Sequence, residues 1–375
     1  MDKQSFMQIP LSSPDITEAE IEAVAGVLKT PNLSLGPKLP EFEKVMAEYV
    51  GVKYAVAVNS GTSALHLIVR SLGIAEGDEV ITTPFSFIAS ANCILFERAR
   101  PVFVDIDPQT FNLDVDKIED RISPKTKAIL AVDIFGLPAD WEELERISRK
   151  HDLKLIEDSC EALGAEYKGS KVGAFGDAAC FAFYPNKQIT TGEGGVVVSN
   201  DQGIAEMCRS MRNQGREGED DWLQHQRLGY NYRLSDISCA LGIAQMRRIE
   251  EILRKREKVA NMYNQKLKSV EGVRVPYDSP EIKRSWFVYV VVLADKYSKE
   301  QRDDILKKLK ENGIGCAGYF PPIHLQPFYA ERFGCRRGDY PVAEHVSERT
   351  MALPFYNNLT ERQIEYIVAN LKERL

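Results

Sequence analysis

The 375-residue chain lacks a hydrophobic run that approaches the ~20 apolar residues of a membrane-spanning helix. Its first ten residues carry Asp2, Lys3 and Gln4 and lack the long apolar core of a signal peptide. Internal repeats, low-complexity tracts and Pro/Ser-rich linkers are absent as well. We therefore expect a cytoplasmic globular protein that does not interact with membranes.

The chain also lacks paired cysteines and an excess of positive charge. Its seven cysteines are scattered, contain no CxxC pair and are odd in number, so we expect reduced thiols and assign no metal site. A formal net charge of −7 argues against binding along a nucleic-acid backbone. A local basic pocket for a single nucleotide is still compatible with that charge.

What the chain does contain is a regular alternation of short apolar runs and helical patterns over its first two thirds. This alternation indicates an α/β fold with a mostly parallel sheet flanked by helices. The length allows a large domain, predicted over residues 1–245, and a smaller α+β domain over residues 246–375. Seven runs are predicted to be the strands of the sheet: Tyr54–Val58, Glu79–Thr82, Val102–Asp105, Ala128–Val132, Leu153–Glu157, Ala179–Phe183 and Val196–Ser199.

Several other segments have recognisable patterns. The spacing of Thr17 and Glu20 is that of a capping box at a helix start. Apolar periodicity over 235–256 predicts one long helix that bridges the two domains. Strand-like residues over 286–293 and helical patterns over 303–312 and 361–371 suit the smaller domain. The polar stretch 213–229 predicts a long loop, and loops of that length are usually functional or disordered.

A single lysine lies between a strand-like run and a glycine-rich segment. Lys187 follows Pro185 and precedes the glycines of residues 192–195. Such a setting suits a lysine that forms a Schiff base, because it offers a fixed backbone, partial burial and small neighbours that admit a flat ring. Taken alone, the pattern is more often that of a solvated lysine on a turn.

An acidic residue ends the strand-like run before this lysine. Pyridoxal phosphate (PLP) acts as an electron sink only while its pyridine nitrogen is protonated, so it needs a carboxylate partner, often at the end of a strand. Asp158 suits that role better than Glu157, because alternation along a strand turns the two to opposite faces. An acid at this position is also a common N-cap of a following helix.

A third element is a small-residue turn between a strand and a helix. Backbone N–H groups at the helix start, at Gly61, Thr62 and Ser63, together with two hydroxyl groups, form a potential phosphate cradle. An ordinary capped helix is the competing interpretation.

The order of phosphate cradle, pyridine acid and lysine resembles that of the nucleotide-sugar aminotransferase family (DegT/DnrJ type), which belongs to the fold type I PLP enzymes. The resemblance covers nearly the whole chain. The matching segments are Pro37 with Glu41–Glu43, Ser60–Ala64, Pro84–Ala89, Glu157–Asp158 with Ala162–Ala165, Thr191–Gly195, Gly229–Arg233 and His324–Pro327.

This resemblance implies a role for each cofactor residue. Lys187 would hold PLP covalently and act as acid and base, while Asp158 would pair with the pyridine nitrogen. Gly61, Thr62 and Ser63 would bind the phosphate, and Phe87 would stack on the ring.

The resemblance also implies a homodimer with shared active sites. Asn231 and Arg233 would then reach the cofactor phosphate of the neighbouring subunit. Glu193, Tyr319 and His324 are the expected contacts of the substrate.

Two positions depart from the family pattern. Glu161 stands where the family commonly has Gln or His, and Ala182 stands where it often has Ser. A carboxylate near the phenolic oxygen of the ring would be repulsive unless it is protonated or turned away. We keep Glu161 among the expected cofactor contacts, whereas Ala182 would remove one hydrogen bond to the phosphate.

The implied reaction moves an amino group from a donor, glutamate by the resemblance, to a keto sugar carried by a nucleotide, for amino-sugar and surface polysaccharide biosynthesis. Two alternatives stay open, a PLP-dependent sugar dehydratase of the same fold and a non-catalytic regulatory protein. Residues 320–324 look closer to relatives that act on 4-keto sugars than to those that act on 3-keto sugars, and the nucleotide cannot be read from the sequence.

Overall fold

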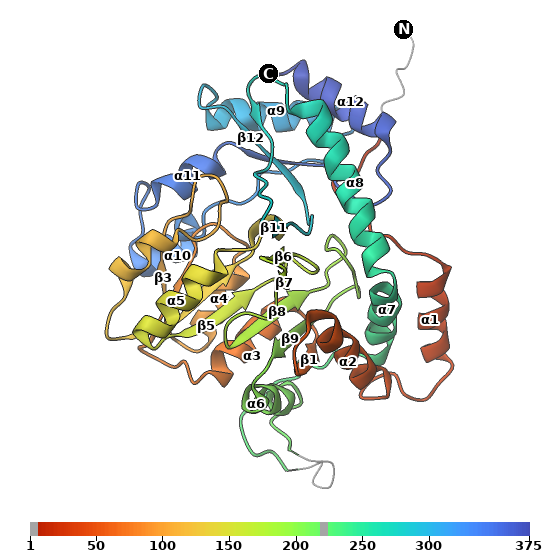
Figure 1. Cartoon of the computed structure of the whole chain (residues 1–375), viewed down its shortest axis with the longest axis vertical. Coiled ribbons are helices and arrows are strands. Elements are labelled where there is room, and N and C mark those ends of the chain that lie inside the picture. The colour runs from red at the N-terminus through yellow and green to blue at the C-terminus, as the bar shows by residue number, and fades with distance from the viewer. Residues whose placement is uncertain (1–6, 218–223) are drawn as a thin grey trace.

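The alternating pattern of the first two thirds of the chain folds into one seven-stranded sheet (Figure 1). The structure is a computed structural model that describes residues 7–217 and 224–375. The strands, in spatial order, are β1 (Tyr54–Val58), β9 (Gly195–Ser199), β8 (Ala178–Ala182), β5 (Lys154–Asp158), β4 (Thr126–Val132), β2 (Glu79–Thr82) and β3 (Arg100–Phe103). Strand β9 is antiparallel to both of its neighbours, and the other pairs are parallel. All seven predicted strands are confirmed, with ends within two residues of the prediction.

Helices cover both faces of this sheet, which explains why its strands read as continuous apolar runs. In β1, Val56 and Val58 pack into one core cluster, whereas Ala55 and Ala57 pack into another on the opposite face. The helices of the large domain are α1 (Glu18–Leu28), α2 (Lys38–Val50), α3 (Gly61–Ser71), α4 (Ala89–Phe96), α5 (Trp141–His151), α6 (Gln202–Arg212) and α7 (Asp236–Arg247). Helices α3, α4 and α6 contribute to the first cluster, α2 and α7 to the second, and α5 packs beside β4 and β5.

The C-terminal part has its own core around a small antiparallel sheet. The long helix α8 (Ile249–Leu267) leads from α7 to this part, at the top of Figure 1, where it contacts α12. The elements there are β10 (Val273–Arg274), β12 (Tyr289–Leu293), β13 (Thr350–Leu353), α9 (Lys299–Glu311), α10 (Pro327–Phe333), α11 (Pro341–Ser347) and α12 (Glu361–Lys372). A third sheet joins β6 (Glu166–Tyr167) and β7 (Ser170–Lys171) to β11 (Ile282–Lys283). The strand and the two helices predicted for this part are confirmed.

We propose the boundary between the large and the small domain at residues 245/246, as expected from the sequence. Tyr263 of α8 and Tyr289 of β12 stack at a centroid distance of 4.6 Å inside the second core. Ile9 lies in that same core and forms a bridge with Ile314, so this part of the N-terminal segment packs with the small domain.

The prediction of one helix over 235–256 is wrong. The chain forms α7 and α8 with a break at Arg248, where φ is −108° and ψ is 8°. Neither glycine nor proline marks the break, so the apolar periodicity continues across it. The polar stretch 213–229 contains no helix in its described residues, and residues 218–223 lie outside the described part of the chain.

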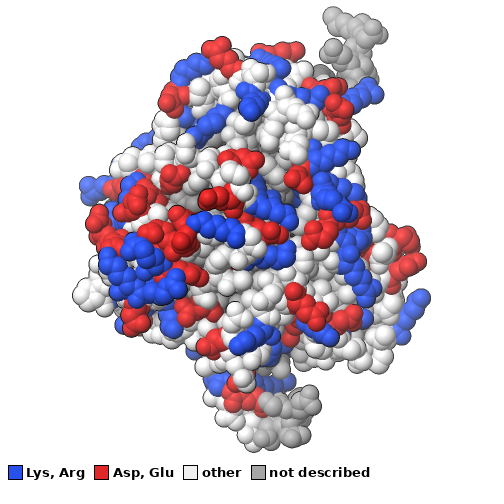
Figure 2. Space-filling model, in the orientation of Figure 1, with Lys and Arg blue, Asp and Glu red and all other residues white. Residues whose placement is uncertain are grey.

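The structure also bears on the expectations about membrane spans, surface charge and cysteines. In the described ranges, no helix is both long and apolar enough to cross a bilayer. Residues 1–6, which include Asp2, Lys3 and Gln4, lie outside the described residues. On the face shown in Figure 2, basic and acidic side chains are interspersed. All seven cysteines are free thiols.

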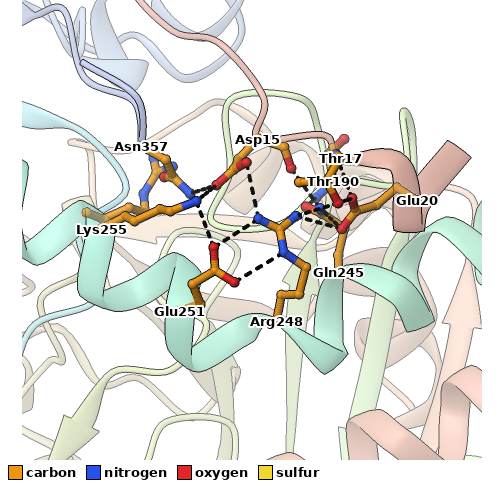
Figure 3. A network of polar contacts seen from close by, with 10 residues as sticks. Asp15, Thr17, Glu20, Thr190, Gln245, Arg248, Glu251, Lys255 and Asn357 are labelled. Carbon is orange, nitrogen blue, oxygen red and sulfur yellow. Dashed lines mark hydrogen bonds and ion pairs between the residues drawn. The ribbon is translucent and has the colours of Figure 1, made fainter. Parts of the chain in front are cut away.

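A polar network surrounds the break between α7 and α8 (Figure 3). Arg248 binds Glu20 of α1 at 2.9 Å, Asp15 at 3.3 Å and Glu251 of α8 at 3.2 Å. Glu20 also accepts a hydrogen bond of 2.7 Å from the backbone N–H of Thr17, which confirms the predicted capping box. The network therefore joins the N-terminal segment to both helices at the domain boundary.

The same network extends to both domains. Asn357 donates to Asp15 at 2.9 Å from the small domain, and Lys255 donates to the same carboxylate at 3.0 Å. On the other side, the side-chain amide of Gln245 donates to Glu20 at 2.9 Å and accepts from the backbone N–H of Thr190 at 3.3 Å. Thr190 lies three residues after Lys187, so the segment that carries this lysine is anchored to the domain boundary.

We expect Arg248→Ala to lower the free energy of unfolding by about 2–3 kcal/mol, because it removes a cation that compensates two buried carboxylates. The Arg248 side chain is 14% exposed. Its neighbour Arg247 is the matched control, since its side chain is 73% exposed and Arg247→Ala should change the stability by less than about 0.5 kcal/mol. Urea unfolding of both variants measures the difference. Equal losses would contradict a special contribution of the network.

Candidate active site

The candidate residues meet because several strands end at one edge of the large sheet. Strands β4, β5 and β8 are parallel, so Val132, Asp158 and Ala182 all lie at their carboxyl ends. Strand β9 runs in the opposite direction and begins at that edge with Gly195, opposite Val58 at the end of β1. Ligands of open α/β sheets bind outside this edge.

A cavity of about 750 Å³ lies at this edge, within the range of small-molecule sites. Its wall combines the ends of the strands, the start of α3 and α4, and a segment of the small domain. The lining residues are Ser60, Gly61, Thr62, Leu65, Ser86–Ser90, Val132, Asp158, Cys160, Glu161, Ala182, Tyr184, Asn186, Lys187, Glu193, Gly194, Phe287, Gly318–Pro321, Ile323 and Gln326.

Lys187 enters the cavity from the turn that follows β8. Its backbone N–H closes this turn by donating to the carbonyl of Tyr184 at 2.9 Å. The side chain is 13% exposed, and its Nζ lies 3.9 Å from the centre of the Phe287 ring and 3.7 Å from Oε1 of Glu161. The lysine is therefore held in a mostly buried position against an aromatic ring, unlike a solvated lysine on a turn.

Asp158 lines the cavity from the end of β5, whereas Glu157 faces away from it. Ser90 of α4 donates to Oδ2 of Asp158 at 2.7 Å, and the backbone N–H of Cys160 donates to Oδ1 at 3.2 Å. Glu157 instead accepts hydrogen bonds from the backbone N–H groups of Gly173 and Phe175. Strand alternation thus separates the two acids as expected.

The start of α3 forms another part of the cavity wall. The side chain of Ser60 caps the helix by accepting from the backbone N–H of Ser63 at 3.1 Å. The first N–H groups of a helix have no partner within it, which leaves Gly61 and Thr62 at the cavity wall able to bind an anion. A Cβ at position 61 would lie 2.7 Å from Cβ of Ala182, so this close approach requires glycine.

Three other predicted residues lie around the cavity. Phe87 is 60% exposed, which is unusual for an aromatic residue and leaves its ring available to a ligand. Glu193 is exposed and Tyr319 half-buried on the lining. Burial raises the pKa of the Tyr319 phenol, and the negative charge of Glu161 raises it further.

Glu161 lines the same cavity and is buried beside Lys187. Its Oε2 accepts a hydrogen bond of 2.9 Å from the backbone N–H of Phe135. Burial raises the pKa of the Glu161 carboxyl, while Lys187 partly offsets this effect. The departure from the family pattern therefore places a carboxyl group next to the lysine nitrogen.

The structure does not bring two predicted residues to the cavity wall. The Ser63 hydroxyl is turned away and donates to Asn59 at 2.7 Å. His324 is fully buried, where its Nε2 lies 3.0 Å from Glu344, so it serves the packing of the small domain. A substrate contact by His324 is not supported, and the nearby Gln326 lines the cavity instead.

Asn231 and Arg233 lie outside the cavity of their own chain. They follow the loop over 213–229 and run beside the end of β1, where Arg233 forms a bridge with Val58. The Arg233 guanidinium donates to the side chain of Asn213 at 3.1 Å, and Asn231 is exposed. Their predicted role toward a second subunit stays a prediction.

Two functional residues were missed by the sequence analysis. Ser90 orients Asp158 although the two are 68 positions apart, and Phe287 packs against Lys187 from the small domain. Ser86 and Ser90 have helical i, i+4 spacing and their hydroxyls lie 3.0 Å apart, but this spacing alone carries no signal for a pyridine site. No local pattern marks Phe287.

The residues present fit PLP. A buried lysine, a carboxylate oriented by hydrogen bonds, and a helix start whose glycine leaves room for an anion surround one cavity. These groups would hold the aldehyde carbon, the ring nitrogen and the phosphate, respectively. No member of this set is missing.

Comparisons with known proteins agree with this geometry. Residues 14–372 match the DegT/DnrJ/EryC1/StrS aminotransferase family. A GDP-perosamine synthase from Caulobacter vibrioides is 40% identical over 98% of each chain. The structure of Helicobacter pylori PseC, an aminotransferase involved in pseudoaminic acid biosynthesis, matches with a TM-score of 0.93 and 31% identity over 98% of this chain and 99% of that one. A Streptococcus pneumoniae protein described as a sugar aminotransferase, solved in its PLP form, matches with a TM-score of 0.93 and 29% identity over 98% of each chain.

The match extends over nearly the whole length of both partners in each comparison, so it includes both domains and every element around the cavity. The fold type I architecture, the aminotransferase activity and PLP as the cofactor are confirmed predictions. The chain belongs to the DegT/DnrJ/EryC1/StrS aminotransferase family.

Proposed function

We propose that this aminotransferase moves an amino group from an amino acid, glutamate by its resemblance, to the keto group of a nucleotide-linked deoxysugar, as a step toward surface polysaccharides or glycosides. The observation that carries the proposal is the convergence of Lys187, Asp158 and the start of α3 on one cavity. The similarity to GDP-perosamine synthases and to PseC supports a sugar as the amino acceptor.

Each residue has a task in this proposal. PLP supplies an electron sink when it is bound. Lys187 holds it and afterwards carries the proton from the α-carbon of the donor. Asp158 keeps the ring nitrogen protonated, and Ser90 keeps this carboxylate oriented. Gly61 and Thr62 bind the phosphate through backbone N–H groups, and Phe87 stacks on the ring.

The substrate would approach from the exposed side of the cavity. Phe87, Tyr184 and Glu193 are exposed there, while Tyr319 and Gln326 come from the small domain. We propose that Glu193, Tyr319 and Gln326 contact the sugar, because they supply polar groups on the lining without a role toward the cofactor.

We further propose a cytoplasmic homodimer with shared active sites. Asn231 and Arg233 present an amide and a guanidinium next to the end of β1, yet they do not line the cavity of their own chain. A guanidinium suits a phosphate group, so a second subunit is the proposed recipient.

The nearest alternative is a sugar dehydratase of the same fold. The presence of Lys187 favours transamination, since some such dehydratases replace this lysine with His. Bleaching of the visible absorbance of the bound cofactor by glutamate would support the aminotransferase. Incubation with 3-keto and 4-keto sugars carrying GDP, dTDP or UDP, with detection of the amino sugar by mass spectrometry, would then identify the acceptor.

Lys187→Ala should abolish transamination, with a loss of at least about 10³-fold, because it removes both the covalent attachment and the proton carrier. The variant should also lose the visible absorbance of the covalently held cofactor while keeping its circular dichroism spectrum. Turnover with glutamate near the wild-type rate would refute the assignment of Lys187.

Asp158→Asn should retain bound cofactor and slow the reaction by about 100-fold or more, since an amide can still hydrogen-bond but cannot compensate the charge of the pyridinium. Stopped-flow measurement of the reaction with glutamate separates this rate from binding. A rate within a few-fold of wild type would indicate another carboxylate. Glu161 would then be the first candidate, because Glu157 faces away from the cavity.

A mixture of two inactive variants tests the shared site. Asn231→Asp combined with Arg233→Ala weakens phosphate binding by repulsion and by loss of a cation, whereas Lys187→Ala removes the attachment point. After subunit exchange, about half of the dimers are heterodimers, and each heterodimer has one site with both an intact Lys187 and intact Asn231 and Arg233. Up to about one quarter of the wild-type activity should therefore return. No recovery despite confirmed exchange would mean that each chain builds its own site.

A further inference from the structure

The buried carboxyl of Glu161 depends on very few polar partners. In the part of the chain that the structure describes, its Oε2 accepts one hydrogen bond from Phe135, and Lys187 Nζ lies 3.7 Å from its Oε1. The side chains of Glu161 and Lys187 are 5% and 13% exposed, respectively. A buried carboxylate with one N–H donor relies on the ammonium for charge compensation, so loss of that positive charge would be costly.

The described part of the cavity wall offers no other cation to replace the ammonium of Lys187. Among the described residues that line the cavity, Lys187 is the only lysine or arginine, whereas Asp158, Glu161 and Glu193 are acidic. Asp158 raises the pKa of Glu161 further, and burial raises the pKa of the neighbouring Tyr319 and Cys160 side chains. The carboxyl of Glu161 and the amine of Lys187 therefore compensate each other.

The backbone on both sides fixes this pair. Phe135 has φ 54° and ψ 26°, a left-handed conformation that is uncommon for residues other than glycine, and in this conformation its N–H reaches Glu161. On the other side, the Gln188 side chain donates to the carbonyl of Glu161 at 2.6 Å and to that of Ser285 at 3.1 Å. Gln188 directly follows Lys187 in the chain. The contacts of Phe135 and Gln188 therefore help to set the distance between the amine of Lys187 and the carboxyl of Glu161.

We propose that Glu161 exchanges a proton with Lys187 and holds it as a carboxylic acid whenever the lysine nitrogen acts as a neutral amine. The inference rests on the proposed function, in which this nitrogen condenses with the aldehyde of PLP. Glu161 is a positioning residue in this scheme, because it acts through Lys187.

The step balances within the pair. One N–H bond of the ammonium breaks and one O–H bond forms at Glu161, so an ion pair becomes two neutral groups and no proton enters the solvent. The free electron pair of the amine then forms a C–N bond with the aldehyde carbon, and the aldehyde oxygen leaves as water with the two remaining amine protons. Burial favours this exchange, because it removes both charges of the ion pair from water.

The pH dependence of cofactor attachment tests the exchange. With cofactor-free wild-type protein and added PLP, the fraction of neutral amine should be independent of pH between about pH 6 and pH 8, because the proton moves inside the pair. In Glu161→Gln the solvent must take the proton, so this fraction should rise about tenfold per pH unit. The ratio of the attachment rates, variant over wild type, should therefore rise by the same factor. The titration of PLP itself affects both rates equally and therefore has no effect on this ratio.

Two variants separate proton exchange from a merely structural role. Glutamine has nearly the size of glutamate and can still accept the N–H of Phe135, so it preserves the local fold. Glu161→Asp retains a carboxyl group and should restore the wild-type pH dependence of attachment. A constant ratio of Glu161→Gln to wild type across this pH range would overturn the proposal, as would an aspartate variant that behaves like the glutamine variant.

An infrared measurement checks the protonation state without any cofactor. Lys187→Met removes the cation, so at neutral pH it should show the band of a protonated carboxyl that is absent in the double variant Lys187→Met/Glu161→Gln. Burial also raises the pKa values of two other acids, Asp133 and Glu157. Their infrared bands are present in both variants and therefore disappear from the difference spectrum. No difference between the two spectra would overturn the proposal.

These measurements use only the protein and PLP. If the proposed function is wrong, wild-type protein still takes up PLP but does not aminate a nucleotide sugar in the presence of glutamate. If the proton exchange is wrong, amination proceeds, while the ratio of the attachment rates of Glu161→Gln and wild type does not change with pH. The two failures are therefore distinguishable.

Discussion

The close contact between strand β9 and the turn before α3 determines the geometry of the whole site. A Cβ at Gly195 would lie only 2.4 Å from the carbonyl oxygen of Ser60, so two backbone segments touch where other residues would keep them apart. Because β9 is antiparallel, its first residue reaches the edge at which β4, β5 and β8 end. The start of α3, the carboxylate of Asp158 and the amine of Lys187 thus line one cavity, although they are distant in the sequence.

Much of this arrangement could be predicted from the sequence because it follows from local patterns. Buried strands give continuous apolar runs, and an acid or a lysine at the end of such a run must lie at the edge of the sheet. Asp158 and Lys187 accordingly both line one cavity, and strand alternation distinguishes Asp158 from Glu157. Side chains whose role depends on tertiary contacts were not predictable. Nothing adjacent to His324 indicates that Glu344 binds it in the core, and nothing near Phe287 indicates Lys187.

The electrostatic character of the cavity could be anticipated only in part. The sequence shows that Glu161 departs from the family pattern, but the consequence depends on which groups surround it. Among the described residues, three acids and a single amine line the wall, and the carboxyl of Glu161 accepts its hydrogen bond from the backbone N–H of Phe135, which has a left-handed conformation. The break at Arg248 was missed for a similar reason, since the partners that stabilise it, Asp15 and Glu20, lie more than 200 residues earlier.

The hydrogen bond between Gln245 and Thr190 has a mechanical consequence. Helix α8 begins at the break next to Gln245 and continues into the small domain, which contributes Phe287 and Tyr319 to the cavity. Gln245 lies on α7, before this break, so its hydrogen bond holds the backbone three residues after Lys187 to the large domain. The lysine and the Phe287 ring therefore come from opposite sides of the break, so the 3.9 Å between Nζ and the centre of this ring depends on the direction that α8 takes after Arg248.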